Sequence, residues 1–468
     1  MKKTLRNIEP EVIEEKPFHD CKLDREKYAI NLTRIIENYP GGFVLALNNR
    51  WGDGKTFFVN RWRQYLKNEG FQTIYFNAWK DDYSENPLLA IIAELSADIE
   101  NPNKKLLEIV IEAGTPIFSR SIPVILKAAI KKGIGTKGLD EIAEIIGEEI
   151  GKPFEKLIHD YKKQKESIKR FKDALSAFAE ESGSGKPVVF FIDELDRCKP
   201  SYAVEILELI KHLFDVENIV YVLSLDKDQL SNSVKGYYGS EHINGNEYLK
   251  RFFDIEFVLP QADLEKTVSH FYNLNNLEKL FIARLPSGNY RRDIQEFKLY
   301  SQILFENQNL NLRTISKIFT QTQLAIYSFG KTAHFYPSTL IFLIFLFNES
   351  KSNYNRIRNR QITSPDLLKL HNEMIQAAEA QNQKISEDFL EWTEVDLIYL
   401  NENHRTRNGI SQLIDNRESF LKTFQDSSIN AEELYKNIQK PYSIPRKDEV
   451  AMKYILDKIE FTEDLIIN

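Results

Sequence analysis

The residues Gly52-Asp53-Gly54-Lys55-Thr56 constrain the fold of this chain more than any other stretch. They fit the end of the Walker A pattern G-x-x-x-x-G-K-[ST], in which the backbone amides of a glycine-rich loop surround a phosphate at the start of a helix. The run FVLALN before the loop has the continuous apolar character of a strand in a parallel sheet. The segment TFFVNRWRQYLKNEG after it has helical periodicity and stops at Gly70. The stretch therefore predicts a strand–loop–helix unit of an α/β fold.

The Walker A pattern gives each position of the loop a role. The amides from Gly52 to Thr56 would surround the β-phosphate, and Lys55 would reach the β- and γ-phosphate oxygens. The Thr56 hydroxyl would bind Mg²⁺. The predicted nucleotide-binding residues are Asn49, Trp51, Gly52, Asp53, Gly54, Lys55, Thr56 and Phe57.

Two positions depart from what the pattern usually holds. Asn49 stands where the pattern begins with glycine, and we expect it to be tolerated because Asn adopts positive φ more readily than other non-glycine residues. Asp53 would lie beside phosphate, so we expect its carboxylate to point outward while its amide points in. A chance match in a turn before a helix is the alternative, and Asn49 leaves the affinity or the turnover open.

A second element, VVFFIDELDR over residues 188–197, is a buried strand that ends in acids. The carboxyl end of a parallel strand borders the crevice in which open α/β sheets bind ligands. Asp193 would hold Mg²⁺ through water, and Glu194 would polarise the attacking water as the catalytic base. Asp196 and Arg197 are expected to form an ion pair at the edge of the site or a subunit contact. The alternative is a strand that simply ends in solvated acids.

Further strands are predicted at FQTIYFNAW, NIVYVLSLD and FFDIEFVLP, and beyond Pro260 the pattern is almost wholly helical. The alternation predicts a three-layer α/β P-loop NTPase fold with a mainly parallel sheet, an inserted helical module and a C-terminal helical domain. The run TLIFLIFLF is about half the length of a bilayer span and is expected to be a buried helix turn or core strand. Residues 348–366 are polar enough for a linker or exposed loop. The expected domains are a lead-in at 1–40, a core at 41–260 with an insertion at about 101–164, a helical lid at 261–347 and a partner or sensor region at 348–468.

Five motifs together resemble the KAP family of P-loop NTPases; in order they are WGDGKT, YFNAWKDDYSENP, FFIDELDRCKP, YVLSLDKDQL and EYLKRFFDIEFVLP. The family has tryptophan before the loop glycine, an Asn-x-Trp motif after the next strand, and a Walker B motif like Asp-[Asp/Glu]-Leu-Asp-Arg-Cys. The resemblance covers residues 20–260. Many members have membrane helices between the Walker motifs, but Lys127, Lys131 and Lys132 interrupt any such span here. The chain is similar to the soluble bacterial-type branch, and this likeness implies a role in defence against phage or other mobile elements.

Other candidate catalytic residues rest on weaker patterns. A γ-phosphate sensor is expected at the end of the strand after Walker B, where Ser224 or Asp226 would contact the attacking water. Lys250 and Arg251, with Arg197 behind them, are candidates for a cation supplied in trans, and surface pairing of Lys250 or Arg251 with Glu247 or Asp254 is the alternative. Arg313 resembles a helical-lid arginine that bends over the nucleotide. Asn77 is expected to bond a loop and Trp79 to pack.

Composition limits the function classes. The net charge of −7 and the pI of about 5.8 do not favour nucleic-acid binding, although basic clusters occur at 162–172 and 356–360. The chain has two cysteines, in dissimilar contexts, and its eight histidines lack metal-ligand spacing, so only Mg²⁺ is expected as a metal. The N-terminus has no apolar signal-peptide core, and we expect a cytoplasmic protein without a membrane partner.

These patterns predict an ATPase that binds and hydrolyses Mg-ATP to drive conformational change or assembly of a complex, as a homo-oligomer or with other protein subunits. The preference for ATP over GTP rests on the resemblance. One alternative is a scaffold that binds ATP without hydrolysis and recruits an effector such as a nuclease. A weaker alternative is a DNA-tracking motor.

Overall fold

The computed structural model describes residues 12–83, 86–97, 108–114, 151–183, 185–284, 290–306, 308, 310–330, 336–379, 387–406, 412–424, 430–439 and 451–465. The chain divides into two compact units, Met1–Pro260 and Gln261–Asn468. Most of the expected insertion, including SIPVILKAAIKKGIGTKG, lies outside the described residues.

Unit 1 contains a five-stranded sheet in the order β2-β3-β4-β1-β5, and every neighbouring pair is parallel. The strands coincide with the five apolar runs predicted from the sequence, which confirms the α/β fold class. Their bounds are β1 (Phe43–Asn48), β2 (Thr73–Asn77), β3 (Val188–Asp193), β4 (Ile219–Leu225) and β5 (Ile255–Val258).

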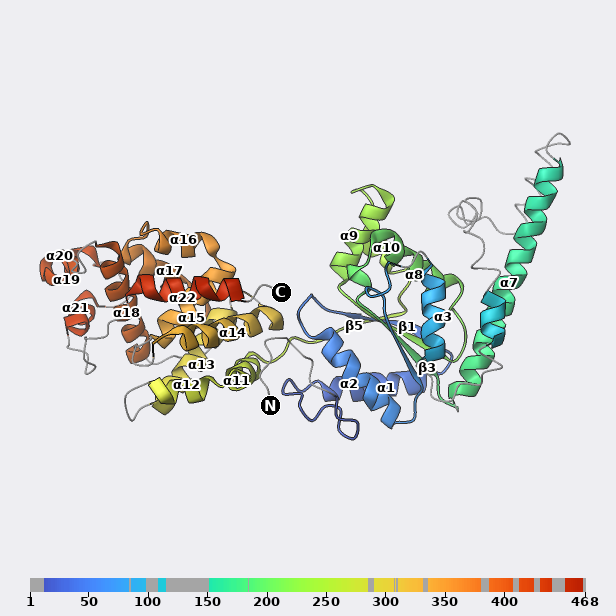
Figure 1. Cartoon of the computed structure of the whole chain (residues 1–468), viewed down its shortest axis with the longest axis horizontal. Helices are drawn as coiled ribbons and strands as arrows, with labels where there is room; N and C mark the ends of the chain where they lie inside the picture. Colours follow the sequence, from blue (N-terminus) through green and yellow to red (C-terminus); the bar gives the residue numbers. More distant parts are fainter. Residues whose placement is uncertain are drawn as a thin grey trace. The chain divides into compact units, whose positions relative to one another are not determined.

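Alternate side chains of the central strands enter two separate cores. In β3, Phe190 and Ile192 join the core on one face of the sheet, whereas Val189 and Phe191 join the core on the other. This alternation follows from the two-residue period of a strand. Helices α1 and α2 cover one face, and α3, α7, α8 and α9 cover the other, so unit 1 has three layers (Figure 1). The helices of unit 1 are α1 (Glu26–Asn38), α2 (Lys55–Asn68), α3 (Pro87–Ala97), α7 (Gly151–Gly183), α8 (Pro200–His212), α9 (Lys227–Tyr238) and α10 (Gly245–Leu249).

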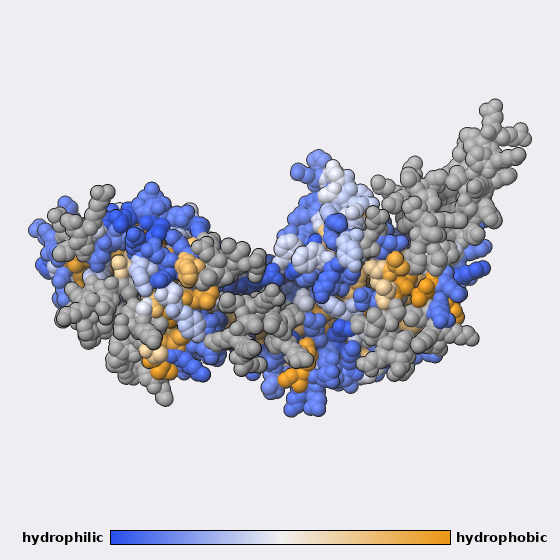
Figure 2. Space-filling model, in the orientation of Figure 1, coloured by the Kyte–Doolittle hydropathy of each residue, from blue (hydrophilic) through white to orange (hydrophobic). Residues whose placement is uncertain are grey.

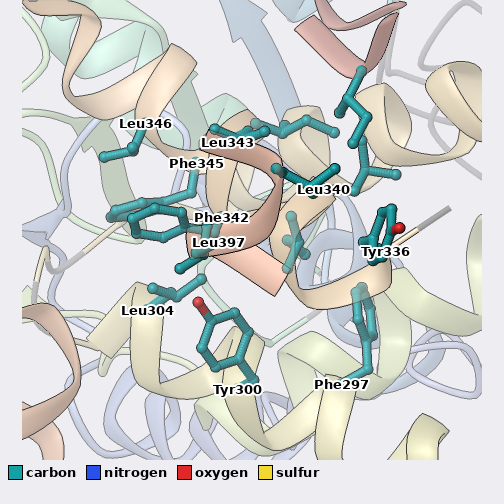
Figure 3. Close-up of a cluster of buried hydrophobic side chains, with 14 of the residues drawn as sticks. Phe297, Tyr300, Leu304, Tyr336, Leu340, Phe342, Leu343, Phe345, Leu346 and Leu397 are labelled. Carbon is teal, nitrogen blue, oxygen red and sulfur yellow. The ribbon is translucent and has the colours of Figure 1, made fainter. Parts of the chain in front are cut away.

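Unit 2 is helical throughout its described residues, as expected. Its core includes Phe297, Tyr300 and Phe342, drawn in Figure 3. The same core continues to Ile459, across residue 348 where we expected the lid to end. Its helices are α11 (Leu264–Leu274), α12 (Leu277–Arg284), α13 (Tyr290–Glu306), α14 (Leu312–Ser328), α15 (Pro337–Glu349), α16 (Lys351–Arg358), α17 (Ser364–Glu379), α18 (Glu387–Arg405), α19 (Gln412–Asp415), α20 (Arg417–Thr423), α21 (Ala431–Gln439) and α22 (Met452–Leu465).

Two sequence expectations are decided in this unit. The run TLIFLIFLF is a helix, α15, and all of its side chains are buried. The expectation of a linker or exposed loop at 348–366 is wrong, because most of this stretch is helical: α15 ends at Glu349, α16 follows, and α17 begins at Ser364. Tyr354 and Ile357 lie one turn apart on α16, and their burial holds an otherwise polar helix on the core.

The outer surface is mostly hydrophilic on the face drawn in Figure 2, with small groups of hydrophobic residues. Among the described residues, none of the helices combines the length and the apolar character that crossing a bilayer requires.

Candidate nucleotide-binding site

The parallel strands bring their polar ends to one edge of the sheet. Asn77 at the end of β2 lies opposite Asp193 of β3, and Asp193 lies opposite Ser224 of β4. The strand β1, which leads into the phosphate loop, pairs with β4 on its other side. The loop and the acidic end of β3 therefore lie at the same edge, as the sequence predicts.

The phosphate loop has the backbone conformation that brings amides together. Gly52 and Gly54 have φ values of 88° and 79°, and Gly54 is the N-cap of α2. Only glycine adopts such angles at little cost. A left-handed residue followed by a helical one forms a concave set of N–H groups that suits an anion, and the N-terminus of α2 adds positive potential.

Lys55 lies in the first turn of α2 and is buried. Its ammonium donates to the carbonyls of Asn49 at 2.6 Å and Arg50 at 3.3 Å, so it lies over the concave side of the loop. Burial lowers the pKa of Lys55, and the carboxylates of Asp196, Asp226, Asp193 and Asp53 act in the opposite direction. One ammonium thus faces several acids.

Asn49 is accommodated for a reason other than the one expected. It is not among the non-glycine residues with positive φ in the described chain. Instead, its side-chain nitrogen donates to the backbone carbonyl of Leu259 at 3.1 Å, and its side-chain oxygen accepts from the backbone N–H of Arg50 at 3.0 Å. Asn49 therefore ties the start of the loop to the chain after β5, which a glycine would not do.

The Asp53 carboxylate does not point out to solvent, which corrects our expectation. Its side chain is 12% exposed and lies 3.8 Å from the Arg50 guanidinium. This pairing compensates part of its negative charge and holds the carboxylate beside the loop.

Asp193 is fully buried at the end of β3. One of its oxygens accepts from the Glu194 amide at 2.9 Å, and the other accepts from the Tyr75 hydroxyl at 3.1 Å. These bonds fix the carboxylate in an orientation set by β2 and β3 together. Tyr75 was not identified from the sequence, where it is one of several aromatic residues in a strand.

Glu194 follows Asp193 with a left-handed backbone, φ 61°, which is unusual for a residue with a side chain. Its carboxylate pairs with Arg197 at 2.9 Å and approaches the Asn77 amide at 3.5 Å. Burial raises the pKa of Glu194, and Arg197 lowers it in part. A carboxyl with a raised pKa is suited to accepting a proton from water.

Arg197 also lies 5.3 Å from the ring of Trp79. Trp79 was expected to pack. The residue is 49% exposed, and its ring lies against the Arg197 guanidinium at the surface, as aromatic faces commonly do. Asn77 meets the expectation of bonding a loop, since its oxygen accepts from the Lys80 amide at 3.1 Å.

Trp51 joins the loop to two acids that follow β3 and β4. Its indole N–H donates to Asp196, and its backbone amide donates to Asp226 at 3.2 Å. Burial raises the pKa of Asp196, while Lys55 and the Trp51 hydrogen bond lower it. From the sequence we expected Asp196 and Arg197 to pair at the edge of the site or to form a subunit contact; Arg197 pairs with Glu194 instead, and Asp196 bonds to Trp51. The place of Asp196 beside the loop needs the strand order, which the local sequence does not contain.

Ser224 and Asp226 differ in what the structure gives them. The Ser224 hydroxyl is buried and has no hydrogen-bond partner among the described residues. Asp226 is the N-cap of α9, accepting from the amides of Asp228 and Gln229, besides its bond to Trp51. Ser224 is the side chain of the two with a free polar atom at the sheet edge.

The remaining candidate residues each have local surroundings of their own. Lys250 pairs with Glu247 at 2.6 Å, and both side chains are about 60% exposed. This is the surface pairing that we gave as the alternative to a cation supplied in trans. The backbone carbonyl of Arg251 accepts from Lys211 at 3.1 Å. Arg313 is exposed on α14 of unit 2. Phe57 lies in the first turn of α2, where the Arg61 guanidinium covers its ring.

The residues at this edge fit a magnesium ion of the kind bound with phosphates. No group of three or more metal-ligating His, Cys, Asp or Glu exists within the described ranges. Mg²⁺ at nucleotide sites typically takes one or two protein groups, with phosphate oxygens and waters completing its shell. Asp193 and the Thr56 hydroxyl supply such a set, and the surplus of carboxylates around Lys55 favours a cation.

The sequence matches the KAP family P-loop domain over residues 25–326. Among solved structures, the chain is similar to the Aeropyrum pernix ORC2 protein in its ADPNP–ADP complexes, with 13% identity and a TM-score of 0.34 over 94% of this chain and 95% of that one. No curated protein matches the chain.

Proposed function

Because this chain belongs to the KAP family of P-loop NTPases, we propose that it binds Mg-ATP at the loop of residues 49–56 and hydrolyses it. The observation that carries the proposal is the shared sheet edge. The loop after β1, Asp193 and Glu194 lie there together, and Trp51 and Asp196 bond across it.

Each residue has a task in the proposed reaction. The amides of residues 52–56 and the Lys55 ammonium bind the phosphates. Thr56 and Asp193 would hold Mg²⁺, which would supply positive charge to the phosphate oxygens. Glu194 accepts the proton of the attacking water. The water oxygen bonds to the γ-phosphorus while the bond to the β–γ bridging oxygen breaks. Ser224 would orient the water.

Hydrolysis would drive conformational change or assembly of a multi-protein complex, and we place this complex in bacterial anti-phage defence. The support is the resemblance of the five sequence motifs to soluble, bacterial-type family members. Unit 2, with its own core, would hold or sense the partner. In a bacterial host made phage-resistant by this protein with its partners, Glu194→Gln should abolish resistance, and resistance that survives the substitution would contradict the role of turnover.

A scaffold that binds ATP without hydrolysing it is the second candidate. The observation in its favour is that the Glu194 carboxylate is already engaged by Arg197 and approached by Asn77. The Glu194 side chain must leave these partners, or share them with water, to act as a base. A DNA-tracking motor has less support, since Arg358 of the basic cluster at 356–360 pairs with Asp457 and Glu460.

Phosphate release and ATP binding, measured on the same variants, decide between hydrolysis and scaffolding. We expect Glu194→Gln to retain ATP binding and to lower kcat by roughly 10²–10⁴-fold, the range typical of a lost general base. Glu217→Gln, an exposed glutamate of the same unit, is the matched control and should behave as the wild type. Wild-type protein that binds ATP but never releases phosphate, even with its partners, would favour the scaffold.

A further inference from the structure

Arg25 is a buried arginine that contacts the phosphate loop from outside the Walker motifs. It directly precedes α1 and is 1% exposed. Its guanidinium donates to two successive loop carbonyls, that of Asp53 at 2.7 Å and that of Gly54 at 2.9 Å. The guanidinium therefore forms a fork on the outer side of the loop.

Peptide geometry links this fork to the inner side of the loop. In a trans peptide the carbonyl of one residue points opposite to the N–H of the next. When Arg25 holds the carbonyls of Asp53 and Gly54 on one side, the amides of Gly54 and Lys55 must point to the other. Those two amides belong to the set that faces the phosphates.

The Asp53–Gly54 peptide needs such a restraint more than its neighbour does. Gly54 tolerates φ of either sign, so this peptide plane can turn over at little conformational cost. The Gly54 carbonyl also accepts from the Phe58 amide at 3.1 Å, so the helix helps to fix the second plane. Arg25 donates to the Asp53 carbonyl and thereby opposes the flip of this peptide.

The position of Arg25 is itself strongly restrained. Burial lowers its pKa, with Cys21 and Asp53 acting against this shift. Its Nε atom has no hydrogen-bond partner among the described residues, so the carbonyl fork is the main interaction that compensates the buried charge. Because burying a cation stabilises a fold little, we infer that this guanidinium orients the loop carbonyls that it binds.

We propose that Arg25 is a positioning residue that holds the peptide planes of the phosphate loop with their amides toward the nucleotide. The role deepens the proposed function, because it concerns affinity for the phosphates bound at that loop. Arg25 touches the backbone of the loop and not the reacting atoms, so it should act on KM more than on kcat.

Two measurements on Arg25→Ala, Arg25→Gln and Arg25→Lys test this role. Hydrogen–deuterium exchange of a peptide that contains residues 50–57, without nucleotide, should be faster in Arg25→Ala and Arg25→Gln. Affinity for Mg-ATP, from calorimetry, should fall about tenfold or more, as expected for the loss of hydrogen bonds to a charged group. Arg25→Lys keeps the charge but reaches one carbonyl, so its affinity should be intermediate, and KM should rise more than kcat falls in each variant.

Arg61→Ala is the matched control, because Arg61 is also buried and pairs with Asp20 rather than with the loop carbonyls. It should lower the melting temperature without selectively raising exchange in the loop. Wild-type exchange and wild-type Mg-ATP affinity in Arg25→Ala would overturn the inference; if that variant does not fold, the same results in Arg25→Lys and Arg25→Gln would do so. If the wild type binds no nucleotide, the proposed function fails, and the exchange measurement still decides the role of Arg25.

Discussion

Single carboxylates at the edge of the sheet should make the activity depend on pH. Glu194 accepts a proton only when it is ionised, and its pKa is raised by burial and lowered in part by Arg197. The rate should therefore fall as the pH drops through that raised pKa. The acidic limb of the profile should lie at higher pH than an unperturbed glutamate would give.

Arg197→Ala removes the cation that favours the ionised carboxylate, so the acidic limb should move to still higher pH. The measurement is kcat against pH for the wild type and the variant, with Arg34→Ala on the exposed face of α1 as the control. A limb that stays in place would show that the Arg197 ion pair does not act on the proposed base, Glu194.

Trp51 should contribute to the affinity of the loop through its indole N–H. Trp51→Phe keeps an aromatic ring but removes the hydrogen bond to Asp196. Loss of one hydrogen bond to a charged group predicts Mg-ATP affinity weaker by roughly ten- to a hundredfold. Titration calorimetry measures this, with Trp392→Phe in unit 2 as the control. Unchanged affinity would mean that the Trp51–Asp196 bond is not needed to shape the loop.

The directions of single side chains could not be predicted from the sequence. Asn49 and Asp53 were identified as unusual, but their surroundings depend on the Leu259 carbonyl and on the pairing of Asp53 with Arg50. Arg25 gives no signal at all, because an arginine before a helix is common and its partners are backbone carbonyls. Motifs predict which residue types meet, whereas the tertiary fold decides where they point.

At the level of elements, the five strands were predictable because each is a short apolar run bounded by turn residues. The strand order was not, since nothing in a run specifies its neighbour. The polar stretch at 348–366 was misassigned because its average composition is polar. Only a few of its residues hold the helix on the core, and an average does not reveal them. Tyr354 and Ile357 are these residues in α16, and a period-based search at i and i+3 would have found them.

The burial of Glu394 between α17 and α18 should make unit 2 lose stability as the pH rises toward neutral. Glu394 is buried on α18, and burial raises its pKa to about 7. The folded state keeps a proton that the unfolded chain releases above about pH 4.5, so stability falls between about pH 4.5 and pH 7 and is level above that. His371 has its effect at acidic pH. Burial lowers the pKa of His371 to about 4, so the unfolded chain takes up a proton first, and stability is lost as the pH falls from about 6.5 toward 4.

Glu394→Gln removes the titrating group while keeping the shape of the side chain. The variant should be more stable than the wild type at pH 8, by up to about 3 kcal/mol, and close to it at pH 5. Urea unfolding at both pH values, followed by circular dichroism of the helices, measures the difference. Glu433→Gln, exposed on α21, is the control, and an equal effect of Glu394→Gln at both pH values would contradict this pKa shift.

For the whole molecule, the division at residues 260 and 261 predicts that unit 2 folds without unit 1. The described residues of its hydrophobic core, from Val268 to Ile459, all belong to unit 2. A fragment of residues 261–468 should be helical by circular dichroism and should melt in one cooperative transition. A fragment that melts without cooperativity would show that unit 1 supplies part of its stability.

The most direct test of the nucleotide site is a crystal structure of the protein with Mg²⁺ and a non-hydrolysable ATP analogue. We expect the β-phosphate against the amides of residues 52–56, Lys55 on the β- and γ-phosphate oxygens, and Mg²⁺ held by Thr56 and by Asp193 through water. Nucleotide bound elsewhere, or a loop that stays empty at saturating nucleotide with Lys55 on the carbonyls of Asn49 and Arg50, would contradict the proposed site.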